Sequence, residues 1–130
     1  MSTYYTIKKR LTSDSSGDAS AVTESITGEL ISIVSVPGAS TVQPTTNFDL
    51  DLQQANLSGG VLDLTLFTDD TVVNNAVTQW LPTIPATKSV DGSASVLTEK
   101  SPVIFGPITI IGANMGNSKI ADIILVIKTV

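Results

Sequence analysis

Carboxylates are the side chains of this sequence with the most evident capacity for chemistry. Asp49 and Asp51 stand two residues apart, and Asp63 follows in a similar alternating run. Residues two apart on a strand project from one face, so such a pair could hold Ca²⁺ or act as acid and base. No calcium-loop pattern surrounds them, and we interpret them as a solvated strand face. The adjacent pair Asp69 and Asp70 receives the same interpretation.

The other short motifs predict no catalytic machinery either. The G-x-x-x-G of Gly112 and Gly116 lies between two strand-like runs and lacks the Lys of a phosphate-binding loop. The sequon at Asn56 matters only on a secretory route. The chain has no His and no Cys, which excludes His-based triads, thiol chemistry and most zinc sites. We therefore expect no catalytic residue, no metal and no cofactor, and a protein that is not an enzyme.

Composition sets the class of protein and its partners. The 130 residues are 42% apolar but only 5% aromatic, with a net charge of −5 and seven Lys and Arg. A chain of this length predicts one domain, residues 1–130, and its acidic balance disfavours nucleic acid as a partner. No apolar run approaches the ~20 residues of a membrane helix, so no membrane partner is expected. No signal-peptide core follows the basic Lys8, Lys9 and Arg10.

The last thirty residues are expected to form the centre of the fold. Two runs rich in Ile and Val, residues 108–111 and 120–127, flank a segment of Gly and Asn residues. β-Branched residues favour strands, and Gly and Asn allow the chain to reverse. We predict a hairpin of these two strands. The second run is apolar at both parities, which predicts that both of its faces are buried.

Further strand-like runs precede this pair and predict the fold class. Residues 3–11 alternate as an edge strand, residues 47–53 place Phe48, Leu50 and Leu52 on one face, and residues 61–67 do the same with Leu62, Leu64 and Leu66. Residues 19–26 make a weaker strand, and Gly28 separates them from the strong run 29–36, which Pro37 ends. The sequence predicts an all-β fold, a single antiparallel β-sandwich or barrel of jelly-roll or immunoglobulin-like type.

Residues 68–101 are the exception, with no sustained period and several turn signals. Unstructured segments of this length are uncommon in compact domains and are usually functional or disordered. We expect one long loop or arm here, with a short helix or extended arm at residues 72–80. It holds the only Trp, Trp80, which predicts a partner-binding segment of Trp80, Leu81, Pro82 and Ile84. The alternative is that Trp80 plugs one end of the sandwich.

The order of several short motifs resembles a group of small virion proteins of tailed bacteriophages. The motifs are Val36-Pro37-Gly38, then the strand PTTNFDLDL from Pro44 to Leu52, Gly106-Pro107-Ile108-Thr109-Ile110, and Gly116-Asn117-Ser118-Lys119 before an apolar terminal strand. The chain differs from that group after Leu52, where the sequence LQQANLSGGVL replaces an acidic loop. The resemblance therefore implies no role for acidic residues there.

This resemblance implies a structural protein of the phage particle, in particular a cement or decoration protein on the capsid surface, made in the host cytoplasm. Its partners would be the major capsid protein and itself, as a homotrimer. Two alternatives stay open: a tail or baseplate module that binds glycans, with Trp80, Tyr4 and Tyr5 stacking on sugar rings, and an adhesion module that accepts a strand from a neighbour.

Overall fold

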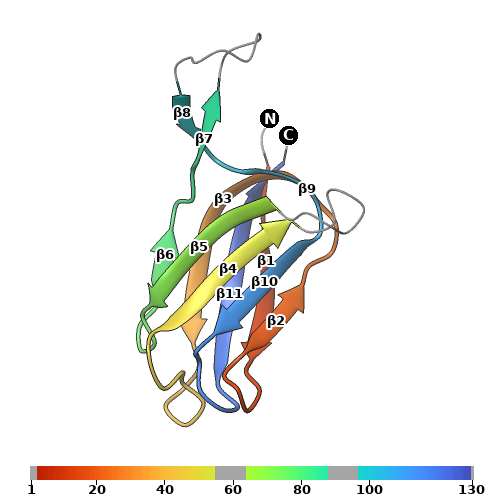
Figure 1. Cartoon of the computed structure of the whole chain (residues 1–130). Helices are drawn as coiled ribbons and strands as arrows, with labels where there is room; N and C mark the ends of the chain where they lie inside the picture. Colours follow the sequence, from red (N-terminus) through yellow and green to blue (C-terminus); the bar gives the residue numbers. More distant parts are fainter. Residues whose placement is uncertain (1–2, 55–63, 88–96, 130) are drawn as a thin grey trace.

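The computed structural model describes residues 3–54, 64–87 and 97–129, which form strands and no helix (Figure 1). This confirms the all-β prediction for the described part of the chain. The strands are β1 (Tyr4–Thr12), β2 (Ala19–Val22), β3 (Ile26–Pro37), β4 (Phe48–Gln54), β5 (Leu64–Val72), β6 (Thr78–Trp80), β7 (Ile84–Thr87), β8 (Leu97–Lys100), β9 (Val103–Gly106), β10 (Ile108–Ala113) and β11 (Ile120–Lys128).

Two antiparallel sheets face each other as a sandwich. In the first, the order is β1-β11-β3-β6, and β9 also pairs with β3; in the second, it is β2-β10-β4-β5. Neither sheet closes on itself, so the sandwich prediction is confirmed and the barrel alternative is excluded. A separate pair, β7 and β8, stands clear of the sandwich in Figure 1.

The core lies between the sheets and is built from alternate residues of each strand. On β4, the side chains of Phe48, Leu50 and Leu52 are fully buried, as the alternation predicted. Ile33 of β3 and Leu125 of β11 are fully buried as well. This alternation is typical of a sheet that has one face on a core and one face toward solvent.

The predicted C-terminal hairpin is wrong. β10 pairs with β2 and β4 in the second sheet, whereas β11 pairs with β1 and β3 in the first, so the chain crosses between the sheets. Asn114, Gly116 and Ser118 in the connection have positive φ. The backbone there makes a wide turn instead of the tight reversal of a hairpin. It also inserts Met115, fully buried, between the sheets. The connection is therefore an arch around a core side chain.

The terminal strand is buried unequally on its two faces. Ile123, Leu125 and Ile127 face the core and are fully buried, while Ile124 and Val126 on the outer face are half-buried. The prediction that both faces are buried therefore holds for the inner face only. The neighbouring strands β1 and β3 flank β11 and partly cover the side chains on its outer face. Among the described residues, no further layer of structure packs on that face.

Gly28 does not separate two strands, as was predicted, but lies within β3. A Cβ there would stand 2.6 Å from the carbonyl oxygen of Lys128 on β11. The glycine therefore permits a close approach of the two backbones rather than a turn. The strong run does end at Pro37, as expected.

The prediction of an irregular segment over residues 68–101 is wrong in part. β5 continues to Val72, residues 72–80 contain no helix, and β6, β7 and β8 follow. Short strands of three or four residues carry too few positions to show a period. The expected arm does occur, as the hairpin of β7 and β8 (Figure 1). Residues 55–63 and 88–96 lie outside the described residues, as do the predictions for Asn56, Leu62 and Asp63.

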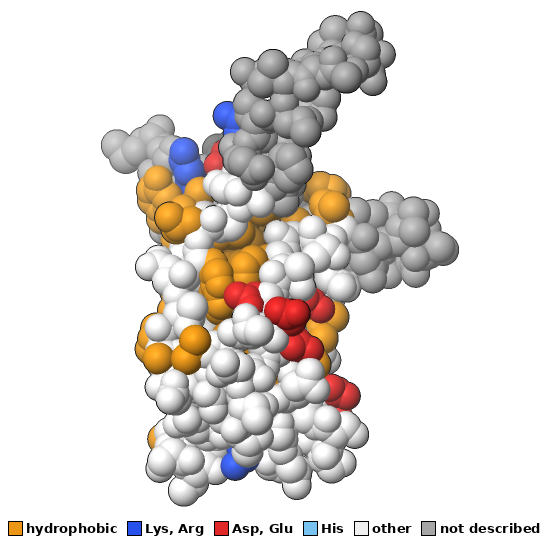
Figure 2. Space-filling view, turned by 60° about the vertical axis from the view of Figure 1, so that its left-hand side comes forward, with side chains coloured by type: hydrophobic (Ala, Val, Ile, Leu, Met, Phe, Trp, Pro, Cys, Tyr) orange, Lys and Arg blue, Asp and Glu red, His pale blue; other side chains and the backbone are white. Residues whose placement is uncertain are grey.

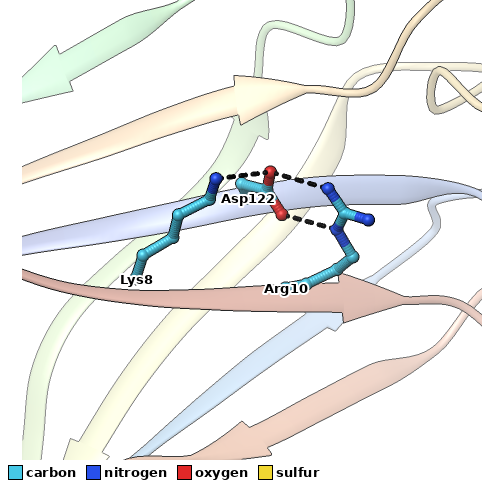
Figure 3. A network of polar contacts seen from close by, with 3 residues as sticks. All are labelled: Lys8, Arg10 and Asp122. Atoms are coloured by element: carbon cyan, nitrogen blue, oxygen red, sulfur yellow. Dashed lines mark hydrogen bonds and ion pairs between the residues drawn. The ribbon is translucent and has the colours of Figure 1, made fainter.

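A charged network joins β1 and β11 on the outer face of the first sheet (Figure 3). Arg10 lies directly opposite Asp122 and donates from Nε and from its terminal nitrogen to the two carboxylate oxygens, at 2.9 and 3.2 Å. The Lys8 ammonium lies 3.5 Å from the same carboxylate. Arg10, chiefly through its hydrogen bonds, holds the pKa of Asp122 below its usual value, although burial opposes this shift.

We expect Asp122→Asn to lower the melting temperature at pH 7 and to have little effect in acid. A pKa that is lower in the folded state stabilises the fold above the unfolded-state pKa, about 3.9 for Asp. That stabilisation is lost as the pH falls through the folded-state pKa. Thermal unfolding from pH 7 to pH 2.5, with the exposed Asp18→Asn as control, measures the difference. An equal loss at both ends of this range would contradict the prediction.

Candidate partner-binding site

Trp80 lies at one open side of the sandwich, where the two sheets end. It is the last residue of β6 and pairs with Ile33 of β3, whose side chain points into the core. The indole is half-buried and packs against the core cluster. Trp80 therefore closes this side of the sandwich while part of its surface stays in contact with solvent.

Residues of β5 fix the orientation of the indole ring. The Nε1–H of Trp80 donates to Oδ2 of Asp69 at 3.0 Å, and the ring packs on Phe67 with centroids 5.1 Å apart and planes tilted by 59°. The other oxygen of Asp69 accepts from the backbone N–H of Thr71 at 2.8 Å. β5 and β6 belong to different sheets, so these contacts tie the sheets together at their edges.

An open hollow of about 420 Å³ lies beside this aromatic pair, which we call the Trp80 hollow. Its walls come from two segments of the chain: Thr65, Leu66, Phe67 and Thr68 of β5, and Trp80, Leu81, Pro82 and Thr83. Figure 2 shows this side of the molecule, with an apolar patch directly beside a group of acidic side chains. The lining combines aromatic, aliphatic and hydroxyl groups, which is typical of binding surfaces.

The structure brings three of the four predicted site residues together in this hollow. Leu81 is 72% exposed, whereas Pro82, in the connection between β6 and β7, is buried. Ile84 begins β7, the first strand of the arm, and its side chain lies outside the described part of the structure. Trp80 fits both the partner-binding hypothesis and the alternative that it plugs the sandwich, because it packs on the core and also lines an open surface.

Phe67 lines the hollow and Asp69 accepts the hydrogen bond of its indole, and neither residue was predicted from the sequence to take part in the site. The register of β5 against β4 shifts between Leu52 and Gln53: Phe67 pairs with Leu52 and Thr65 pairs with Gln53, so Leu66 has no β4 residue directly opposite it. This bulge leaves Leu66 buried and Leu64 37% exposed, against the predicted shared face. The available signal was the adjacent apolar pair Leu66 and Phe67 within an otherwise alternating run.

The carboxylates of β4 accept hydrogen bonds from neighbouring side chains. Asp49 accepts a hydrogen bond from Asn114 Nδ2 at 2.8 Å, and Asp51 accepts one from the Thr68 hydroxyl at 2.5 Å. Within residues 3–54, 64–87 and 97–129, no three acidic side chains are grouped to hold a metal ion.

No helix in that same part of the chain is long and apolar enough to span a membrane.

We expect Trp80→Ala and Leu81→Ala to differ in their effect on stability. Removing the indole leaves a gap between the sheets and an unpaired Asp69 carboxylate, at a cost of about 3 kcal/mol. Removing the exposed Leu81 side chain should change the free energy of unfolding by less than about 0.5 kcal/mol. Urea unfolding followed by far-ultraviolet circular dichroism measures both. Equal, small effects would mean that Trp80 does not close the sandwich.

Comparisons with known proteins add little to this geometry. No family model matches the chain, and no curated protein matches it. Among solved structures, the chain is similar to the crystal structure of PirA, with a TM-score of 0.48 and 10% sequence identity over 93% of this chain and 92% of that chain. The function therefore has to be argued from this chain's own surface.

Proposed function

We propose that this chain is a non-enzymatic structural protein of a bacteriophage particle, a capsid cement or decoration protein that binds the major capsid protein lattice. The motif order from Val36 to Lys119 supports the phage assignment through resemblance. The Trp80 hollow supports the binding role. A protein of this kind would be located on the capsid surface and would be made in the host cytoplasm.

The observation that carries the binding role is the position of the hollow. It lies on the side of the sandwich formed by the edge strands β5 and β6, and the chain leaves from it through Pro82 and Thr83 into the arm of β7 and β8. A two-stranded hairpin standing clear of a core is only marginally stable by itself. An exposed aromatic hollow at the base of such an arm is suited to a protein partner that contacts both.

Self-association, as a homotrimer, is the second part of the proposal. The outer face of the first sheet carries half-buried apolar residues on its two central strands, such as Val34 and Val36 of β3 and Ile124 and Val126 of β11. In addition, β1 and β2 are edge strands with one unpaired side. A symmetric ring would cover such faces and edges.

A tail, baseplate or adhesion module that binds glycans is the alternative function. The observation that favours it is the lining of the hollow, where the Trp80 ring lies beside the threonines at positions 65 and 68. Tyr4 and Tyr5, the other aromatics considered for stacking, are exposed on β1 at the opposite side of the sandwich. They cannot join Trp80 in one sugar site.

We expect the protein to co-sediment with expanded, DNA-filled heads of its phage in many copies. Leu81→Lys should weaken this binding by about 2 kcal/mol or more, roughly 30-fold, because it places a positive charge at the centre of the contact. Val22→Lys is the matched control, since Val22 is 58% exposed on β2 at the other side of the sandwich. Copies on tails only, or equal effects of the two variants, would contradict the proposal.

We further expect a solution mass of about 40 kDa, three times the 13.5 kDa of one chain. The physical reason is the burial of the outer apolar face and of the free edges in a ring. Light scattering after size exclusion, over a range of micromolar concentrations, measures this mass. A value near that of a single chain at every concentration would count against self-association.

A further inference from the structure

The Trp80 hollow is lined by aromatic, aliphatic and hydroxyl groups, and a group of acidic side chains, which we call the acidic rim, lies beside its apolar patch (Figure 2). Asp69 binds the indole directly, and Asp51 binds the hydroxyl of Thr68, which lines the hollow. Asp70 is exposed two residues further along β5 from Thr68. These three carboxylates come from neighbouring strands, β4 and β5, which pair in the second sheet.

The rim charges have no cationic partner in the described part of the chain. The ion pairs there join Asp122 with Lys8 and Arg10, which lie on β1 and β11 rather than beside β5. Up to three negative charges without a cationic partner in the described part of the chain therefore lie on β4 and β5, beside a half-buried aromatic ring. Unpaired charges of one sign around a concave surface attract the opposite sign.

The indole itself adds to this preference for a cation. The face of a Trp ring is electronegative and attracts ammonium and guanidinium groups within about 6 Å of its centre. Here a carboxylate accepts the Nε1–H at 3.0 Å, which holds the ring in place and places a negative charge at its edge. Lys and Arg also have apolar stems that pack on aliphatic surface, and Leu81 and Pro82 provide such a surface.

From this geometry we infer that the Trp80 hollow binds a Lys- or Arg-bearing segment of the partner protein, with the cationic side chain over the indole and its charge toward Asp51 and Asp70. This inference rests on the proposed binding role and names the chemistry of the partner at that surface. A neutral glycan would use the ring and the threonine hydroxyls but would gain nothing from the acidic rim.

The chain offers a direct probe of this site, because Trp80 is its only Trp. Tetra-arginine should change the intrinsic fluorescence saturably, and raising the salt from 50 to 500 mM should weaken its binding severalfold through screening. Tetra-glutamate and the neutral sugar maltotetraose should leave the fluorescence unchanged. Binding of either control as tight as that of tetra-arginine would overturn the inference, as would an unchanged signal with all three.

The rim can be tested without disturbing the indole. The double variant Asp51→Asn, Asp70→Asn leaves Asp69 and its bond to Trp80 intact, and we expect it to bind tetra-arginine about five- to tenfold more weakly. Asp18→Asn removes an exposed charge at the opposite side of the sandwich and should bind within about twofold of the original chain. Circular dichroism melts of both variants confirm that they are folded. Equal affinities of the two variants would overturn the inference.

Head binding separates failure of this inference from failure of the proposed function. If the original chain binds heads and the rim variant binds them equally well, the cationic partner is overturned and the capsid role stands. If the original chain does not bind heads while tetra-arginine binding depends on the rim, the capsid role is overturned and the cation site stands. Weaker head binding by the rim variant supports both.

Discussion

The fold depends on the arch that carries the chain from β10 to β11, because it places two central strands in opposite sheets. Met115 at its centre is fully buried and donates its backbone N–H to Gly17 at 3.0 Å, while its carbonyl accepts from Thr45 at 3.1 Å. The Ser13 hydroxyl donates to the Gly116 carbonyl and accepts from the Lys119 N–H. The arch thus joins the β1–β2 turn and the β3–β4 connection, and one end of the sandwich is closed by backbone hydrogen bonds.

Strand positions were largely predictable from the sequence, but strand partners were not. The alternation of Phe48, Leu50 and Leu52 fixes one buried face, since a slip by one residue would reverse it. The Gly- and Asn-rich segment after β10 signals a reversal, but the same residues serve a hairpin or an arch. What distinguishes the two is whether Met115 is buried between the two sheets, and this depends on residues far away in the sequence. Pairing over such distances leaves no local pattern.

The candidate site was predictable only where it consists of unusual residues. Trp80 is unique in the chain, and Leu81 and Pro82 follow it directly. Phe67 lines the hollow and Asp69 binds its indole in a part of β5 where register shifts interrupt the pairing with β4. A carboxylate that seemed to belong to a solvated face is in fact the hydrogen-bond acceptor that orients the indole. Such a role follows from the meeting of two sheets, which no single strand reveals.

The carboxylates of the two sheets differ in how their charge is compensated, and this difference underlies the proposed binding site. On the outer face of the first sheet, Asp122 is held by Arg10 and Lys8 on the adjacent strand, so its charge is neutralised within one sheet. At the β5 and β6 side, a single indole spans the gap, and its acceptor Asp69 has no cation beside it in the described part of the chain. A carboxylate bound to an aromatic N–H donor is tolerated there because the side is open to water. A cationic partner would take the place of solvent at this side. The opening that leaves this edge of the fold unsealed would therefore also give a partner access to the carboxylates.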